Sequence, residues 1–257
     1  VLNEQAPVFL RINSLKTNQE KLIEDLYKEE IETEIIPNSE AIKLQVRKNV
    51  FITKAFKDGM FEVQDIGSQK ISQFLNPQPG DKVIDACAGA GGKSLHMANL
   101  MQNKGKILSL DIHEWKLKEL RKRARRNSID IIECREITSQ KVIKRLQSKA
   151  DKLLLDVPCS GLGVLKRNPD TKWKVKQETL DDLRKTQAYI LENYSQMVKP
   201  GGEMVYATCS VLPSENEKQI EAFLEKHSGE WHLLNQESLA PKSEFNDGFY
   251  MAKLKRL

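Results

Sequence analysis

Apolar and polar residues alternate along most of the chain with the periods of buried strands and of helices. From residue 82 onward, short apolar runs are separated by longer segments in which apolar residues recur at helical spacing. Short connections between such runs predict βαβ units and a parallel sheet. The predicted strands cover residues 82–87, 106–112, 129–134, 152–157, 203–209, 231–235 and 248–254. The pattern therefore predicts an α/β fold with about seven strands.

Helical segments lie between these strands, and a smaller mixed unit precedes them. The helices are predicted over residues 93–101, 114–127, 138–149, 179–198 and 214–227. The first part of the chain has the order strand, helix, strand, strand over residues 8–12, 17–30, 32–36 and 41–46. Because Pro77, Pro79 and Gly80 interrupt the pattern, we expect a small α+β unit over 1–76 and a larger domain over 77–257.

Composition narrows the class of protein. A chain of 257 residues can bury a core without disulfides or metals, and no stretch approaches the roughly 18 apolar residues of a membrane span. No signal peptide is visible, and the start on Val1 leaves open whether a segment precedes it. The four cysteines form no C-x-x-C pair, a poor pattern for a zinc site or a disulfide framework. We therefore expect a soluble, cytoplasmic monomer with reduced thiols and no metal.

A glycine-rich turn follows the strand at 82–87. Residues 83–94 read V-I-D-A-C-A-G-A-G-G-K-S, so a strand leads through glycines into a helix whose first N–H groups are free to bind a ligand. The spacing is neither that of a P-loop nor the full G-x-G-x-x-G fingerprint. Asp111, at the end of the next strand, is placed to accept hydrogen bonds from a ribose. These features favour an adenosyl-type cofactor over a structural turn with a surface Asp.

Two cysteines follow neighbouring predicted strands at the point where each strand ends. Cys159 comes shortly after the strand at 152–157, and Cys209 ends the strand at 203–209. Ligands of open α/β sheets gather outside the carboxyl ends of the strands, so the two thiols should converge, with Asp156 beside them. The alternative is that each cysteine is a small buried apolar residue.

Several ordered blocks resemble the RsmB/Nop/Sun (Fmu) family of S-adenosylmethionine-dependent RNA 5-methylcytosine methyltransferases. The resemblance covers almost the whole chain. The blocks are R-I-N at Arg11, F-K-D-G-M-F-E-V-Q-D-I-G-S-Q at 56–69, the glycine-rich turn, D-V-P-C-S-G-L-G at 156–163, R-N-P-D-T-K-W at 167–173, A-T-C-S-V-L-P-S-E-N-E at 207–217 and D-G-F-Y-M-A-K-L at 247–254.

The resemblance implies a class I (Rossmann-like) methyltransferase with a small RNA-recognition-like unit at its N-terminus. It also implies methylation of carbon 5 of a cytosine in structured RNA. Ribosomal RNA is the expected substrate, because it is the commoner substrate in the family. The resemblance implies that Cys209 adds to carbon 6 of the base, which makes carbon 5 nucleophilic, and that Cys159 assists release. A nucleophilic thiol must be partly ionised. Asp156 either shares a proton with ring nitrogen 3 or only orients the loop at the strand end.

The same resemblance implies a set of residues that bind S-adenosylmethionine. They are Cys87, Ala88, Gly89, Ala90, Gly91, Gly92, Lys93, Asp111 and Asp156. The family usually has C-A-A-P-G-G-K where this chain has C-A-G-A-G-G-K, and the missing proline changes the rigidity of the turn. Cys87 and Cys134 are expected to be structural. No residue after the third strand is assigned to the adenine.

Two basic clusters are candidates for RNA contacts. In the helix at 115–126, a solvated helix face is the preferred interpretation. The second cluster lies close after Cys159, and its position favours contacts with phosphates. Its members are Lys166, Arg167, Lys172, Lys174 and Lys176, of which the first four are the candidate RNA contacts. Trp173 in the same loop either stacks on a base or packs against the sheet.

Other functions remain open at this point. The altered glycine-rich turn is compatible with a non-catalytic RNA-binding ribosome-assembly factor derived from a methyltransferase. A transfer RNA cytosine-5 methyltransferase is a second alternative. Methylation of DNA or of a free nucleotide is disfavoured by the blocks around Arg167 and Cys209.

Overall fold

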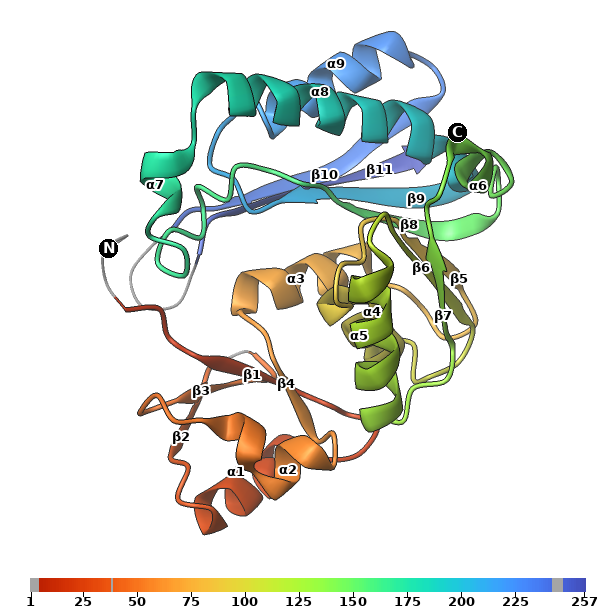
Figure 1. Cartoon of the computed structure of the whole chain (residues 1–257). Coiled ribbons are helices and arrows are strands. Elements are labelled where there is room, and N and C mark those ends of the chain that lie inside the picture. The colour runs from red at the N-terminus through yellow and green to blue at the C-terminus, as the bar shows by residue number, and fades with distance from the viewer. Residues whose placement is uncertain (1–4, 38, 242–246) are drawn as a thin grey trace.

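The computed structural model describes residues 5–37, 39–241 and 247–257, and these form two sheets (Figure 1). The smaller sheet is antiparallel, with the strand order β2-β3-β1-β4. Its strands are β1 (Phe9–Ile12), β2 (Thr33–Ile35), β3 (Ala41–Leu44) and β4 (Phe61–Val63). One face is covered by α1 (Gln19–Lys28) and α2 (Lys54–Lys57), with the 3₁₀ turn η1 (Val50–Ile52) beside them.

The larger sheet has seven strands in the order β10-β11-β9-β8-β5-β6-β7. The five parallel strands are β5 (Lys82–Asp85), β6 (Lys106–Asp111), β7 (Ile132–Glu136), β8 (Ala150–Asp156) and β9 (Val198–Thr208). The antiparallel strands β11 (Phe249–Arg256) and β10 (Trp231–Leu239) extend the sheet beyond β9. The prediction of an α/β fold with a seven-stranded, Rossmann-like sheet is therefore confirmed.

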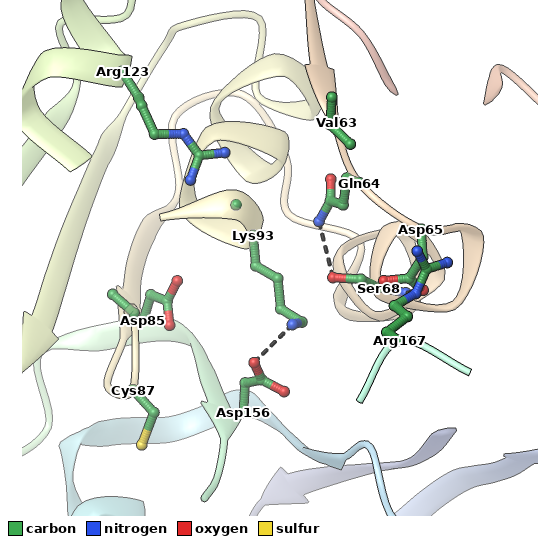
Figure 2. A pocket seen from close by; sticks show the side chains of 12 residues that line it. Val63, Gln64, Asp65, Ser68, Asp85, Cys87, Lys93, Arg123, Asp156 and Arg167 are labelled. Atoms are coloured by element: carbon green, nitrogen blue, oxygen red, sulfur yellow. Dashed lines mark hydrogen bonds and ion pairs between the residues drawn. The ribbon is translucent and has the colours of Figure 1, made fainter. Parts of the chain in front are cut away.

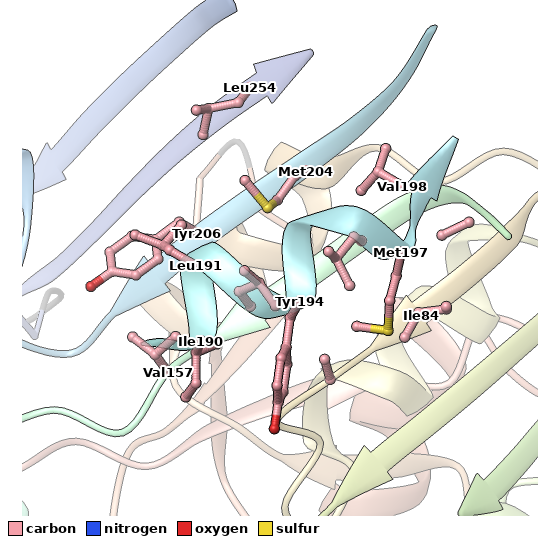
Figure 3. Packing of buried hydrophobic residues seen from close by; sticks show 14 of the residues in the cluster. Ile84, Val157, Ile190, Leu191, Tyr194, Met197, Val198, Met204, Tyr206 and Leu254 are labelled. Carbon is pink, nitrogen blue, oxygen red and sulfur yellow. The ribbon is translucent and has the colours of Figure 1, made fainter. Parts of the chain in front are cut away.

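Helices cover both faces of this sheet, which explains why its central strands are apolar on both sides. On one face lie α3 (Ile66–Leu75), α4 (Gly92–Leu100) and α5 (Glu114–Arg126), and on the other α6 (Gln140–Lys144), α8 (Gln177–Tyr194) and α9 (Glu217–Lys226). In β8, Leu153 and Leu155 pack on the α8 side and Leu154 on the α4 side. Figure 3 shows buried side chains on the α8 side, among them Leu191 and Tyr194 of α8 and Met204 and Tyr206 of β9. The remaining short helices are α7 (Thr171–Lys174) and the 3₁₀ turn η2 (Ser195–Met197).

Some elements differ from the sequence prediction. The pattern did not predict β4 or α3, because α3 buries small polar residues: Gly67 packs so closely that a Cβ there would lie 2.3 Å from the Phe249 ring. The helix predicted over 138–149 is limited to α6, and Ser148 beyond it has a left-handed φ of 53°. The strand predicted over 129–134 is shifted to β7.

The helix α3 connects the two parts of the molecule. It contacts β9, β11 and α4 of the larger part, although it lies before residue 76. The boundary at residue 76 stays a prediction. None of the helices in the described part of the chain has the length and apolar character that a membrane span requires.

The smaller sheet docks on the larger part through buried polar side chains. Along β1, Leu10 and Ile12 face α1, whereas Arg11 points the other way and donates to the carbonyl oxygen of Gly92 at 2.6 Å.

Opposite Arg11 in β4, Glu62 is only 3% exposed and accepts hydrogen bonds from α5, including one from Arg123 at 2.8 Å. The further donors to Glu62 are Arg126 and Asn127. Burial alone would raise the pKa of Glu62, but the two guanidinium groups outweigh it and lower the pKa.

We predict that Glu62→Ala lowers the free energy of unfolding by about 3–5 kcal/mol, because it leaves two partly buried guanidinium groups without their carboxylate. Urea denaturation at neutral pH measures this. The matched control is Glu119→Ala, at a more exposed carboxylate on α5, which should leave the midpoint nearly unchanged. Because the pKa of Glu62 is lowered, its contribution is present at neutral pH and is lost as the pH falls through the folded-state pKa. Equal effects of the two variants would contradict the docking role.

Candidate active site

A cavity of about 340 Å³ opens at the carboxyl ends of β5 and β8. Figure 2 shows its lining, which comes from four parts of the chain. They are the end of β4 with the start of α3, the end of β5 with the glycine-rich turn and the start of α4, Arg123 of α5, and the end of β8 with Arg167 beyond it. The cavity is rich in ionisable groups. Asp85, Lys93, Asp156 and Arg167 all line it, and Asp65 joins them from the N-terminus of α3. This is the sheet edge at which ligands of open α/β sheets bind.

Lys93 and Asp156 form an ion pair inside the cavity, with 2.7 Å between Nζ and Oδ2 (Figure 2). Burial would lower the pKa of Lys93, but the neighbouring carboxylates, Asp156 first, outweigh it and raise the pKa. Lys93 therefore carries its charge at neutral pH. The pair places one positive and one negative group within reach of a molecule bound between β5 and β8.

The glycine-rich turn depends on backbone conformations that favour glycine. Gly91 caps α4 with a φ of 85°, and a Cβ there would lie 2.0 Å from the side chain of Leu120. Gly89 has a φ of 54°, so it adopts a left-handed conformation without steric cost. Two guanidinium groups hold the carbonyl oxygens of this turn: Arg123 donates to Ala90 at 2.7 Å and Arg11 donates to Gly92. The turn is therefore fixed from both parts of the molecule although the usual proline is missing.

The buried carboxylates beside the turn fit S-adenosylmethionine. Asp85 accepts a hydrogen bond from Ser94 at 2.6 Å through Oδ2, whereas its buried Oδ1 has no partner in the described structure. An oxygen of this kind at a cavity wall fits the ammonium group of an amino-acid ligand. Asp111 accepts hydrogen bonds from the backbone of Gly89 and His113, which fix its carboxylate at the end of β6.

The two thiols converge, as the sequence predicts. Asp156 pairs with Ala207 in the β8–β9 ladder, so the two strands end side by side. The Sγ atoms of Cys159 and Cys209 lie 3.2 Å apart, and the backbone N–H of Cys209 also points at Sγ of Cys159, at 3.3 Å. Hydrogen bonding from Cys209 lowers the pKa of the Cys159 thiol, and the same contact raises the pKa of Cys209. In this arrangement Cys159 is the more acidic thiol and Cys209 keeps its proton, so the expectation of a partly ionised Cys209 is not met here. Cys209 must therefore give up its proton before it can attack as a thiolate.

The other cysteines have different surroundings. Cys87 lines the cavity wall, and burial raises its pKa well above the ordinary value for a thiol. Cys134 is half-buried in β7, and burial raises its pKa as well. Neither is polarised toward the thiolate, as expected for structural residues.

The basic residues expected to contact RNA lie in and near α7. Arg167 lines the cavity, and its Nε lies 2.6 Å from the buried carboxylate of Asp247. The ammonium group of Lys172 lies over the Trp173 ring, 5.2 Å from its centroid, and Lys174 pairs with Asp170 at 3.2 Å. Lys166 lies in the same loop, partly buried.

Two interpretations of nearby residues are corrected. Trp173 is 81% exposed, so the alternative that it packs against the sheet is wrong. The helix at 115–126 is only partly a solvated face: Lys118 and Lys122 are exposed, but Arg123 and Arg126 bind the buried Glu62.

Sequence reasoning missed several cavity residues. Asp85 lies in the glycine-rich block at 83–94 but was assigned no role, because its burial is not visible in the sequence. Asp65 follows β4 and accepts a hydrogen bond from the backbone of Ser68 at 2.8 Å, which caps α3. Burial raises the pKa of Asp65. The only sequence signal for Asp65 was its place in the block at 56–69.

Comparisons with known proteins agree with this geometry. The family model described as 16S rRNA methyltransferase RsmB/F matches residues 72–255. A probable ribosomal RNA small subunit methyltransferase B of Synechocystis sp. is 35% identical over 99% of this chain and 61% of its own length. Its counterpart of Bacillus subtilis is 36% identical over 85% of this chain and 49% of its own length. This chain thus spans about half to three fifths of the length of these curated relatives.

Solved structures are similar over nearly the whole chain. The crystal structure of PH0851 has a TM-score of 0.93 at 31% identity and covers 99% of this chain and 61% of that one. The structure of NSun6 from Pyrococcus horikoshii with SFG has a TM-score of 0.89 at 20% identity, with 99% of this chain and 92% of that one covered. At that identity, the second likeness concerns the fold alone.

We predict that Asp85 makes stability depend on pH. Burial raises the pKa of Asp85 from 3.8 to about 7, so between these values the folded state holds a proton that the unfolded state has lost. The free energy of unfolding therefore falls as the pH rises through this window. Asp85→Asn removes the effect, so its stability relative to the wild type should improve by on the order of 3 kcal/mol from about pH 5 to about pH 8. Urea denaturation of both proteins measures this. If the free energies of unfolding of the wild type and of Asp85→Asn changed in parallel with pH, the raised pKa of Asp85 would be contradicted.

Proposed function

This chain belongs to the RsmB/F family of 16S rRNA methyltransferases, and we propose that it methylates carbon 5 of a cytosine in structured RNA. The methyl donor in this proposal is S-adenosylmethionine, and the structured RNA is ribosomal RNA. The observation that carries the proposal is the contact of two thiols, 3.2 Å apart, at the ends of neighbouring parallel strands. The cavity next to them contains the ion pair of Lys93 with Asp156.

Each thiol has its own task in this proposal. Carbon 5 of cytosine is a weak nucleophile until a thiolate adds to carbon 6. Cys209 forms that bond, and the electron pair of the C5–C6 double bond then becomes available at carbon 5. After methylation, the Cys159 thiolate takes the proton from carbon 5, the double bond re-forms and Cys209 leaves as a thiolate. Cys159, whose Sγ lies next to the leaving sulfur, assists this release.

The ion pair inside the cavity serves the ring of the base. Addition at carbon 6 moves negative charge toward ring nitrogen 3, where a proton or a nearby cation stabilises it. The ammonium group of Lys93, 2.7 Å from the Asp156 carboxylate, supplies the proton that Asp156 shares with that nitrogen. Both side chains are only partly exposed, so their interactions are screened less than at a surface.

The cofactor supplies an electrophilic methyl group on a sulfonium. In our proposal Asp85 accepts hydrogen bonds from its ammonium group, Asp111 binds its ribose, and the glycine-rich turn at 87–93 lies against it. The RNA backbone is bound by the basic side chains near α7, with Trp173 free to stack on a base. Free thiols at the site need a reducing compartment, so we place the protein in the cytoplasm.

We predict that Cys209→Ala abolishes methyl transfer to RNA, because no other thiol can add to carbon 6 from the same position. Cys159→Ala should still form the bond to the base but release it slowly, so that a covalent protein–RNA adduct accumulates. Tritium transfer from labelled cofactor and denaturing gels measure the two effects. Cys134→Ala, on β7, is the control and should retain activity. Full activity of Cys209→Ala would falsify the assignment.

We also predict that the protein binds S-adenosylmethionine in calorimetry without RNA. Asp85→Asn should weaken binding by about tenfold to a hundredfold, the effect of losing a charge-assisted hydrogen bond. Asp130→Asn, at an exposed carboxylate, is the control. Absence of binding by the wild type would favour the non-catalytic assembly factor instead.

A further inference from the structure

We propose that Glu215 is a positioning residue that holds the two cysteine-bearing loops in register, a role that rests on the proposed function, in which both thiols act on one base. Glu215 lies in the loop between β9 and α9 and is fully buried. It is not part of the cavity lining, and it touches neither thiol directly. Its contacts instead reach the residue that follows each cysteine.

One carboxylate joins both loops. Ser160, which follows Cys159, donates to Glu215 twice: its backbone N–H to Oε1 at 2.9 Å and its hydroxyl to Oε2 at 2.5 Å. Ser210, which follows Cys209, donates its hydroxyl to the same Oε2. The two serine hydroxyls lie 3.2 Å apart, the same separation as the two thiols. The serines therefore form a second layer of paired side chains behind the cysteines.

The carboxylate is itself fixed from two neighbouring elements. Gln187 of α8 donates to Oε1 of Glu215 and to the carbonyl oxygen of Pro158, both at 2.9 Å, and so reaches the residue before Cys159. The hydroxyl of Tyr206 in β9 donates to the backbone carbonyl of Glu215 at 2.7 Å. Glu215 has little freedom to follow either loop, so it sets where both loops lie.

The chemistry of the contacts explains why a carboxylate is used. Four donor groups converge on the two side-chain oxygens, and a carboxylate can accept from all four of them. Glutamine can replace it with little change: its oxygen accepts from the Ser160 backbone and from Gln187, and its NH₂ group donates to two hydroxyls that rotate to accept. Alanine would leave these donors buried and unpaired.

A second contact keeps the loops together without Glu215. The backbone N–H of Gly163 donates to the carbonyl oxygen of Cys209 at 2.9 Å, and a Cβ on Gly163 would lie 2.1 Å from the carbonyl oxygen of Gly248. Loss of the carboxylate should therefore loosen the alignment of the thiols rather than separate the loops. This allows the role of Glu215 to be measured in a folded protein.

The test uses the pairing of the thiols and needs no methyl transfer. With oxidised glutathione, one thiolate displaces a glutathione thiolate and forms a mixed disulfide, and the second thiol then displaces the other glutathione to close a Cys159–Cys209 disulfide. Closure requires the sulfurs to approach from 3.2 Å to about 2.05 Å. Mass spectrometry separates the two products, because closure removes two hydrogens and the mixed disulfide adds glutathione.

The wild type should give the closed disulfide with little mixed product. Glu215→Ala should raise the ratio of mixed to closed product by about tenfold or more, since small misalignments greatly reduce intramolecular rates. Glu215→Gln should behave like the wild type, and so should the control Glu221→Ala, at an exposed carboxylate of α9. Ser210→Ala, which removes one contact and keeps the carboxylate, should lie between. The ratio is counted only for protein with a wild-type near-ultraviolet spectrum.

A wild-type product ratio in both Glu215→Ala and Ser210→Ala would overturn the proposal, as would a Glu215→Gln variant as impaired as Glu215→Ala. In methyl transfer, Glu215→Ala should lower kcat per folded molecule, with the folded fraction taken from the near-ultraviolet spectrum, and leave KM for S-adenosylmethionine unchanged. If the product ratios follow the prediction and the wild type transfers no methyl group to RNA, the proposed function fails and the positioning role of Glu215 stands.

Discussion

The pairing of β8 with β9 is the constraint on which the site depends. Leu155 lies opposite Tyr206 and Asp156 opposite Ala207, so the two parallel strands end level with each other. The chain leaves both strands toward the same edge and carries a cysteine within three residues of each end. The larger Met204 and Tyr206 of β9 pack on the α8 side and the smaller Val205 and Ala207 on the α4 side, so a slip by one residue would exchange two faces of different size. The proximity of the thiols follows from the register of the core.

A second set of contacts links the smaller sheet to the glycine-rich turn. Arg11 comes from β1 and Arg123 from α5, and each holds a carbonyl oxygen of the turn. Arg123 also binds Glu62 of β4, so one guanidinium bridges the turn and the smaller sheet. The family resemblance of the sequence implies that this sheet belongs to an RNA-recognition-like unit. A movement of that sheet would then also shift the glycine-rich turn, to which we assign cofactor binding. The ion pairs and hydrogen bonds that connect the two have little exposure to solvent.

The sequence was most informative where local pattern decides the outcome. Runs of apolar residues predicted the strands of the larger sheet, and the rule for ligands at strand ends predicted that Cys159 and Cys209 meet. The sequence pattern did not predict α3, because the small residues Gly67 and Ser72 are buried there by close packing. Hydrophobic periodicity does not detect burial of this kind. The order of the strands and the residues that face the cavity depend on the tertiary fold.

Charged residues were the hardest to place. Arg123 and Arg126 belong to a basic run whose sequence is typical of a solvated helix face. Both nevertheless form ion pairs with the buried Glu62, more than fifty residues away in the sequence. Arg167 likewise meets Asp247 from the far end of the chain. Such pairs form only when the fold brings distant segments together, so no spacing in the sequence predicts them. The same holds for the unpaired oxygen of Asp85, which is defined by burial.

The most direct test of the proposed chemistry is to map the covalent bond between protein and base. An RNA substrate in which the target cytosine carries fluorine at carbon 5 cannot lose a proton there after methylation, so the adduct persists. Digestion and mass spectrometry then identify the attached peptide. Our account predicts the bond on the peptide that contains Cys209, and only in the presence of S-adenosylmethionine. A bond on the peptide that contains Cys159 would contradict it.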